Sequence, residues 1–224
     1  KGVVFRTECN ADIQSGSIKN LPESKVGEIM SVKAKTKAYV ASQIRDLLQN
    51  KDTGGGRAML ANLRRGIGKT PGEMPELWGV FLGGLDDALY GQNGKPSSAE
   101  WAVYLSLTMF ALHQQGNADS VQQDAVSLGN AAARLIDRSK NEDEERNRIM
   151  QRFGPVITAS DMPELSHHLR GMIQLFKANN VHLDYVQLAG DLLDFQYQDS
   201  RRKVQLRWGE DFYHIAKSEG DNEL

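Results

Sequence analysis

Residues 99–115, AEWAVYLSLTMFALHQQ, form the stretch that decides the fold. Apolar side chains follow one another there with few polar interruptions, over a length typical of a globular helix. A helix that is hydrophobic on all sides is stable only where other elements cover it on all sides. Ser97 or Ser98 can cap its start, because a hydroxyl there accepts hydrogen bonds from first-turn N–H groups. We therefore predict a central helix over residues 99–115, inside a bundle.

The segments on both sides of this helix repeat their apolar residues at the spacing of amphipathic helices. Val204, Leu206 and Trp208 alternate as in a strand, but the sequence offers no second strand for pairing, so we predict a helix there too. The fold class is therefore all-α. The predicted helices cover residues 36–49, 57–65, 75–90, 99–115, 120–138, 142–152, 162–178, 184–197 and 201–217.

A charged junction at residues 139–145 is the best candidate for a domain boundary. It divides the chain into a larger N-terminal helical bundle, residues 30–140, and a smaller C-terminal helical bundle, residues 141–224. Residues 1–29 are polar and mixed in composition, and we expect them to be a leader, a fusion junction or an added segment.

Composition places the chain among ordinary globular proteins. It has 224 residues, of which 40% are hydrophobic and 25% charged, so a core can form. Its one cysteine, Cys9, excludes an intrachain disulfide and fits a reducing cytoplasm. The sequence has no apolar run of about 18 residues, so we expect no membrane span.

Basic residues are concentrated in three windows that contain no acidic residue, although the formal net charge is −2. Local basic windows on a near-neutral chain indicate one positive face or groove that binds nucleic acid, or else three solvated helix faces. The windows are residues 29–45 with Lys33, Lys35, Lys37 and Arg45, residues 53–72 with Arg57, Arg64, Arg65 and Lys69, and residues 200–209 with Arg201, Arg202, Lys203 and Arg207.

Motifs for catalysis or cofactor binding are weak. Residues 66–70, GIGKT, end like a phosphate-binding P-loop, but Leu63 occupies the position of its first glycine, and Pro71 follows at once. The adjacent His167 and His168 would point about 100° apart on a helix, which does not suit a shared metal ion. No side chain has the neighbours of an activated nucleophile. We predict no cofactor, no metal and no enzyme.

Long parts of the chain resemble the CasB family, the small subunit of the type I-E CRISPR surveillance complex Cascade. The resemblance extends from about residue 37 to residue 213, and the ordered set of segments is more specific than any one of them. The segments are ANLRRGIGKTPGEMPELW (61–78), EWAVYLSLTMFALHQQG (100–116), SLGNAAARLI (127–136), RNRIMQRF (146–153), HHLRGMIQLFKANNVHLDYVQLAGDLLDFQ (167–196) and VQLRWGEDFY (204–213).

This resemblance implies an all-α protein of two helical bundles that is structural and not catalytic. It implies a cytoplasmic complex in which the partners are CRISPR RNA, the target and non-target DNA strands, the backbone and large Cascade subunits, and a second copy of the chain. The role implied is to stabilise the R-loop, in which guide RNA pairs with one DNA strand and displaces the other.

The resemblance also indicates which basic residues would bind nucleic acid, through contacts to backbone phosphates. For any one of these arginines a local ion pair is the alternative, and Glu144 and Glu145 lie close to Arg148 in the sequence. The expected residues are Arg64, Arg65, Lys69, Arg148, Arg152, Arg170, Arg201, Arg202, Lys203 and Arg207.

Two other classes of function stay open at this point. A helical DNA-binding regulator would read duplex bases through a helix-turn-helix, and residues 184–208 supply some suitable side chains. A nucleotide-dependent enzyme would rest on residues 66–70 alone. Sequence-specific duplex binding would favour the first, and ATP binding the second.

Overall fold

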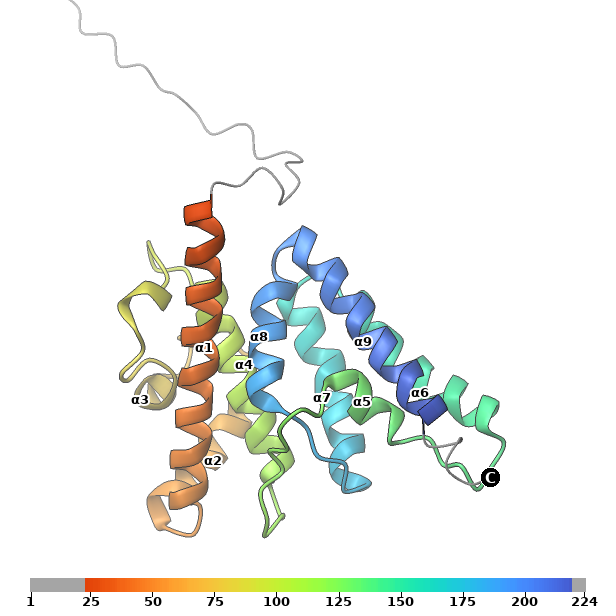
Figure 1. Cartoon of the computed structure of the whole chain (residues 1–224). Coiled ribbons are helices and arrows are strands. Elements are labelled where there is room, and N and C mark those ends of the chain that lie inside the picture. The colour runs from red at the N-terminus through yellow and green to blue at the C-terminus, as the bar shows by residue number, and fades with distance from the viewer. Residues whose placement is uncertain (1–22, 219–224) are drawn as a thin grey trace, which may run out of the picture.

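The computed structural model describes the backbone of residues 23–218 and the side chains of residues 32–214. The fold is all-α, as predicted (Figure 1). In this part of the chain no strand forms, and one isolated bridge pairs Gln122 with Leu183. The elements are α1 (Glu23–Asn50), α2 (Gly54–Arg65), the 3-10 turn η2 (Pro75–Leu77), α3 (Trp78–Phe81), the 3-10 turn η3 (Asp87–Leu89), α4 (Ser98–Gln114), α5 (Leu128–Ala133), α6 (Glu142–Thr158), α7 (Met162–Ala178), α8 (Tyr185–Phe195) and α9 (Gln198–Ser218).

Helix α4 is the predicted central helix, and it is buried on nearly every side. Ser97 caps it in a reciprocal capping box, in which Ser97 Oγ accepts from Glu100 N and Glu100 Oε2 accepts from Ser97 N. Helices α1, α2, α7 and α8 and the short α3 pack around it. The apolar run at residues 99–115 therefore organises helices from both halves of the sequence.

Helix α9 packs along α5 and α8. Val204, Trp208 and Phe212, at a spacing of four residues, form its buried stripe, which confirms the helical prediction for this segment. The predicted division at residues 140/141 stays a prediction, and contacts cross it, since α8 packs on α1 and α4. Most of the predicted leader, residues 1–29, lies outside the described residues, and α1 begins within it at Glu23.

Residues 75–90 do not form the single helix that their apolar spacing predicts. They form η2, α3 and η3, with a break at Gly83 and Gly84. Gly84 has φ +75°, a left-handed conformation that stops a helix and that glycine adopts at no steric cost. Asp86 then accepts a hydrogen bond from Ala88 N and starts the next turn.

The helix predicted over residues 120–138 is confined to α5, residues 128–133. The chain before it is held as a loop by the carboxylate of Asp184, which accepts from Ala125 N at 3.0 Å and from Gln122 Nε2 at 3.0 Å. Ala125 takes φ +62°, which a helix does not allow. A side chain about sixty positions away thus overrides the local helical pattern.

The start of α2 and the end of α6, which lie at glycine and proline residues, differ from the predicted helix bounds. The glycines at 54–56, which lie between the predicted helices of residues 36–49 and 57–65, form the start of α2 behind the Thr53 cap. Helix α6 continues through Pro155 to Thr158 instead of ending at residue 152. Burial explains the second difference, because Phe153 and Val156 both face the core and keep the helix in register across the proline.

The close approach of α5 to α9 depends on Gly129, where an added Cβ would lie 2.1 Å from Trp208 O. We expect Gly129→Ala to lower the free energy of unfolding by about 1–3 kcal/mol, because backbone must move to relieve the overlap. Gly171 is the matched control, since it lies exposed inside α7 with no atom within 4 Å of an added Cβ. Gly171→Ala should stabilise by about 0.5–1 kcal/mol. Urea unfolding of both variants checks this, and a loss of equal size in both would contradict the tight α5–α9 contact.

Candidate nucleic-acid interface

The ten basic residues expected from the sequence lie in two groups. Arg64 and Arg65 end α2, and Lys69 lies in the turn after it. The other seven belong to α6, α7 and α9, on the opposite side of α4 in Figure 1. Helices α6 and α9 lie side by side, because Gln205 Nε2 donates to Ile157 O at 2.6 Å and the Phe153 and Phe212 rings are 5.7 Å apart. The two groups do not form one site.

Arg201 is engaged inside the fold. Its Nε donates to Phe195 O at 2.7 Å and its Nη1 to Ser160 O at 2.8 Å, and its guanidinium lies 4.9 Å from the centre of the Phe195 ring. These contacts join the start of α9 to the end of α8 and to the α6–α7 connection. Two donors of Arg201 thus bind backbone carbonyls of other elements and its guanidinium packs on a buried ring, so its first role is structural.

Arg207 is also engaged, with the buried carboxylate of Asp191. Arg207 Nη2 lies 2.5 Å from Asp191 Oδ1, and Trp208 Nε1 donates to Asp191 Oδ2 at 2.8 Å. Burial raises the pKa of Asp191 to about 6, and Arg207 and the Trp208 hydrogen bond oppose that rise. Arg207 therefore holds a charge in place between α8 and α9.

On α6, Arg148 forms a local ion pair, which was the alternative to nucleic-acid binding. Arg148 makes a two-pronged contact to Glu145, with Nη2 2.6 Å and Nε 3.1 Å from carboxylate oxygens. The Glu145 carboxylate in turn raises the pKa of Arg148. Arg148 can still reach solvent, because about half of its side chain is exposed.

Four basic side chains of this second group are exposed and take part in no ion pair among residues 32–214: Arg152, Arg170, Arg202 and Lys203. Arg202 and Lys203 lie on the solvent side of α9, opposite the buried stripe of Val204 and Trp208. Leu206 and Tyr213 share that side and are 63% and 51% exposed. Among the four expected basic residues of α9, Arg202 and Lys203 are therefore free of ion pairs and exposed, whereas Arg201 and Arg207 are engaged in the fold.

In the first group, Arg65 and Lys69 are exposed, and Arg65 donates to Asn62 Oδ1. Arg64 is different, because it lines a pocket of about 270 Å³ between α2 and the chain that follows α4. Lys51 and Arg57 line the same pocket, and Lys177 reaches its rim by donating to Gln115 Oε1 at 3.1 Å. We call this site, formed by Lys51, Arg57, Arg64 and Lys177, the basic pocket.

The sequence missed most of the basic pocket. Arg57 belongs to a basic window, but Lys51 and Lys177 were not expected at a site, and no local pattern brings residues 51, 64 and 177 together. One weak signal exists, since Arg64 and Lys177 each fall in the last turn of a helix. Cations are favoured there by the helix dipole, but that position does not predict which helix ends converge.

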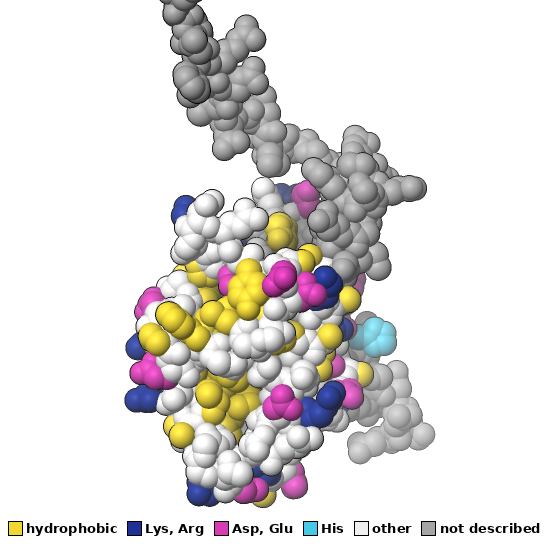
Figure 2. Space-filling view, turned by 90° about the vertical axis from the view of Figure 1, so that its left-hand side faces the viewer, with side chains coloured by type: hydrophobic (Ala, Val, Ile, Leu, Met, Phe, Trp, Pro, Cys, Tyr) yellow, Lys and Arg dark blue, Asp and Glu magenta, His cyan; other side chains and the backbone are white. Residues whose placement is uncertain are grey.

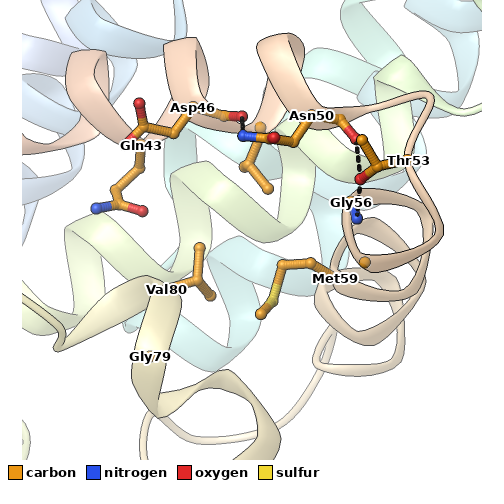
Figure 3. A pocket seen from close by; sticks show the side chains of 10 residues that line it. Gln43, Asp46, Asn50, Thr53, Gly56, Met59, Gly79 and Val80 are labelled. Atoms are coloured by element: carbon orange, nitrogen blue, oxygen red, sulfur yellow. Dashed lines mark hydrogen bonds between the residues drawn. The ribbon is translucent and has the colours of Figure 1, made fainter.

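A second pocket, of about 370 Å³, lies beside the start of α2 (Figure 3). Its lining combines apolar side chains such as Met59 and Val80 with the polar Gln43 and Asp46. Its polar contacts are mostly internal, since Thr53 Oγ1 accepts from Gly56 N and Asn50 Nδ2 donates to Asp46 O. No lysine or arginine lines it, so it does not suit an anion.

Figure 2 shows the side of the molecule on which α3 lies in Figure 1. Hydrophobic side chains gather across its middle, and basic side chains lie around the rim, several of them beside acidic ones. Trp78 and Tyr90, from the segment that includes α3, are 49% and 41% exposed. This side has no continuous basic surface, so the candidate interface lies elsewhere.

The P-loop resemblance at residues 66–70 is not supported by its structural context. Gly66 caps the end of helix α2, and Tyr104 Oη donates to Gly66 O at 2.9 Å. A P-loop instead follows a strand and opens a helix. The described residues contain no group of histidine, cysteine, aspartate and glutamate that could hold a metal ion. Nor is any described helix long and apolar enough to cross a membrane.

Comparison with known proteins gives a consistent result. The sequence model of the family described as CRISPR-associated protein Cse2 matches residues 59–213. The crystal structure of CasB from Thermobifida fusca is similar with a TM-score of 0.64 and 30% identity, over 80% of this chain and 97% of that one. The crystal structure of M. ruber CasB shares the fold, with a TM-score of 0.58 and 23% identity over 81% and 98%. A search of curated proteins found no match.

The contacts of Arg207 predict a structural cost for its removal. Arg207→Ala leaves the buried Asp191 carboxylate short of a partner, so we expect a loss of about 2 kcal/mol in the free energy of unfolding at pH 7.5. The loss should shrink at pH 5.5, because the pKa of Asp191 rises further without Arg207 and the carboxyl becomes protonated. Arg202→Ala should change stability by less than about 0.5 kcal/mol. Urea unfolding at both pH values measures this, and equal losses in the two variants would contradict it.

His113 predicts how stability depends on pH. It is buried at the end of α4 with Nδ1 2.9 Å from Tyr185 Oη, and burial, helped by His182 and Lys177, lowers its pKa to about 4. The folded pKa lies below that of the unfolded chain, so stability is lost as pH falls from about 6.5 toward 4. Between pH 7 and pH 5 this group should remove about 2 kcal/mol. Between pH 7 and pH 5 we expect His113→Gln to lose about 2 kcal/mol less stability than the wild type. Equal losses in the two proteins over this range would exclude His113 as the source of the pH dependence.

Proposed function

The chain belongs to the CRISPR-associated Cse2 family, also called CasB, and is a Cascade subunit; from that premise we propose that it binds nucleic acid through phosphate contacts and catalyses no reaction. The proposed ligands are CRISPR RNA and the target and non-target DNA strands. The proposed protein partners are the backbone and large subunits and a second copy of the chain. We expect the complex in the cytoplasm.

The observation that supports this proposal most directly is the set of exposed cations without ion pairs on α6, α7 and α9, within the described part of the chain: Arg152, Arg170, Arg202 and Lys203. A surface arginine that is already paired gains little from a new contact, whereas a solvated one can pair with phosphate and release counterions. Three of the four are arginines, whose planar guanidinium can donate two parallel hydrogen bonds to one phosphate.

Phosphate contacts suffice for the proposed role, because guide RNA supplies sequence recognition by base pairing. R-loop formation exchanges one duplex for another of similar stability, so a few protein–phosphate contacts can shift the balance. A protein that reads no bases should bind single strands with little sequence preference and with strong dependence on salt.

The test compares two double variants that remove the same charge. Arg202→Ala/Lys203→Ala removes free cations of α9, whereas Arg45→Ala/Lys95→Ala removes two exposed cations that the proposal does not use. We expect the α9 variant to bind labelled single-stranded DNA more weakly. The slope of log affinity against log salt should fall by about 1.4, for two lost phosphate contacts at 0.7 each. The control variant should keep most of the wild-type affinity and slope.

Thermal unfolding of each variant shows that it is folded before binding is compared. Equal weakening in the two variants would mean that net charge, rather than the α9 surface, governs binding. Absence of binding by the wild-type chain would overturn the proposal for the subunit by itself. Strong preference for one duplex sequence would favour a helix-turn-helix regulator instead.

A further inference from the structure

The basic pocket is a second place where cations meet, on the other side of the molecule from α9. The α1–α2 turn provides Lys51, α2 provides Arg57 and Arg64, and the last turn of α7 provides Lys177. Figure 1 shows the α1–α2 turn and the ends of α4 and α7 together at the lower end of the molecule. Three cations therefore line one hollow, and Lys177, from a distant stretch of sequence, reaches its rim through Gln115.

The charges of the basic pocket are not balanced by protein. Asp52 is the one acidic residue among those lining it. No ion pair joins any of the four cations to a carboxylate within residues 32–214. Three lining cations, with Lys177 at the rim, face one lining carboxylate, so the pocket has an excess of positive charge.

Most of the donors in the basic pocket are unused. Arg64 Nη1 makes one long contact to Ala111 O at 3.5 Å, and Arg57 Nη1 donates to Asp52 O at 2.9 Å. Lys51 Nζ donates to Ala118 O, and Lys177 Nζ to Gln115 Oε1. A guanidinium has five N–H donors and an ammonium three, so each of the four cations keeps donors for a further acceptor.

Arg64 and Lys177 lie close enough to each other for their positive charges to interact. Burial lowers the pKa of Arg64, and burial together with the nearby Arg64 lowers the pKa of Lys177. Two like charges that are partly removed from water repel each other, and an anion between them removes that repulsion. The end of a helix favours one cation at its carbonyls, but it does not explain three cations lining one hollow with a fourth at its rim.

We propose that the basic pocket binds a phosphate group of a nucleic-acid strand, as a second contact point separate from α9. The volume of about 270 Å³ is below that of most pockets for drug-sized ligands, which suits one phosphate and part of its sugar. The Figure 3 pocket, which no lysine or arginine lines, is not expected to bind phosphate. The nucleic-acid source of the phosphate rests on the proposed function, whereas anion binding by the pocket does not.

The first experiment uses inorganic phosphate as the probe. We expect phosphate, compared with chloride at equal ionic strength, to raise the melting temperature of the wild-type chain more than that of Arg64→Gln/Lys177→Gln. General salt effects cancel between variants. Arg45→Gln/Lys95→Gln, which removes two exposed cations outside both proposed surfaces, should respond like the wild type, and the charge-conserving Arg64→Lys/Lys177→Arg should keep most of the response. Equal responses of the wild type and Arg64→Gln/Lys177→Gln would overturn the pocket as an anion site.

The second experiment measures binding of single-stranded DNA by the same variants and by Arg202→Gln/Lys203→Gln. We expect Arg64→Gln/Lys177→Gln to weaken binding and to reduce the salt slope by about 0.7, for one lost phosphate contact. The effect should add to that of Arg202→Gln/Lys203→Gln, because the two sites are separate. Phosphate stabilisation with unchanged DNA binding would overturn the nucleic-acid source. If only Arg64→Gln/Lys177→Gln loses DNA affinity, the basic pocket is upheld as a binding site and the α9 surface is rejected as one.

Discussion

Helix α4 can be stable only if its whole circumference is covered, and the arrangement of the other helices follows from this requirement. Its sides are taken by α1 and α2 from before it in the sequence and by α7 and α8 from after it. No helix from one half of the chain can provide that cover alone. The C-terminal helices therefore pack into the same core as the N-terminal ones, and the polar groups at the helix ends are brought together as a consequence.

The basic pocket is one such consequence. Helices α2 and α7 both pack along α4, and the last turns of the three helices lie near one another. The C-terminal end of a helix favours cations, and Arg64 and Lys177 occupy the last turns of α2 and α7. Packing that is required by apolar burial thus concentrates positive charge at one end of the molecule, where solvent and an anion can enter.

Periodicity predicts the elements whose apolar stripe is long, and it fails where a distant contact decides the backbone. The apolar runs of α4 and α7 and the stripe of α9 were sufficient to predict those helices. Residues 120–127 had a helical pattern too, but the carboxylate of Asp184 holds them as a loop. Gly84, with its left-handed backbone, breaks the helix predicted over residues 75–90. The local sequence of residues 120–127 does not indicate the contact with Asp184, which lies about sixty positions away.

The same distinction governs the candidate site. Charge windows and family resemblance locate basic residues, but they do not show which of them the fold already uses. Arg201 and Arg202 are neighbours in the sequence, yet the first donates to two backbone carbonyls and the second faces solvent. Arg207 is paired with a buried carboxylate. An arginine can bind phosphate without loss to the fold only where no internal ion pair has to be broken and donors remain free, so the binding surface is defined by the donors that the fold leaves unused.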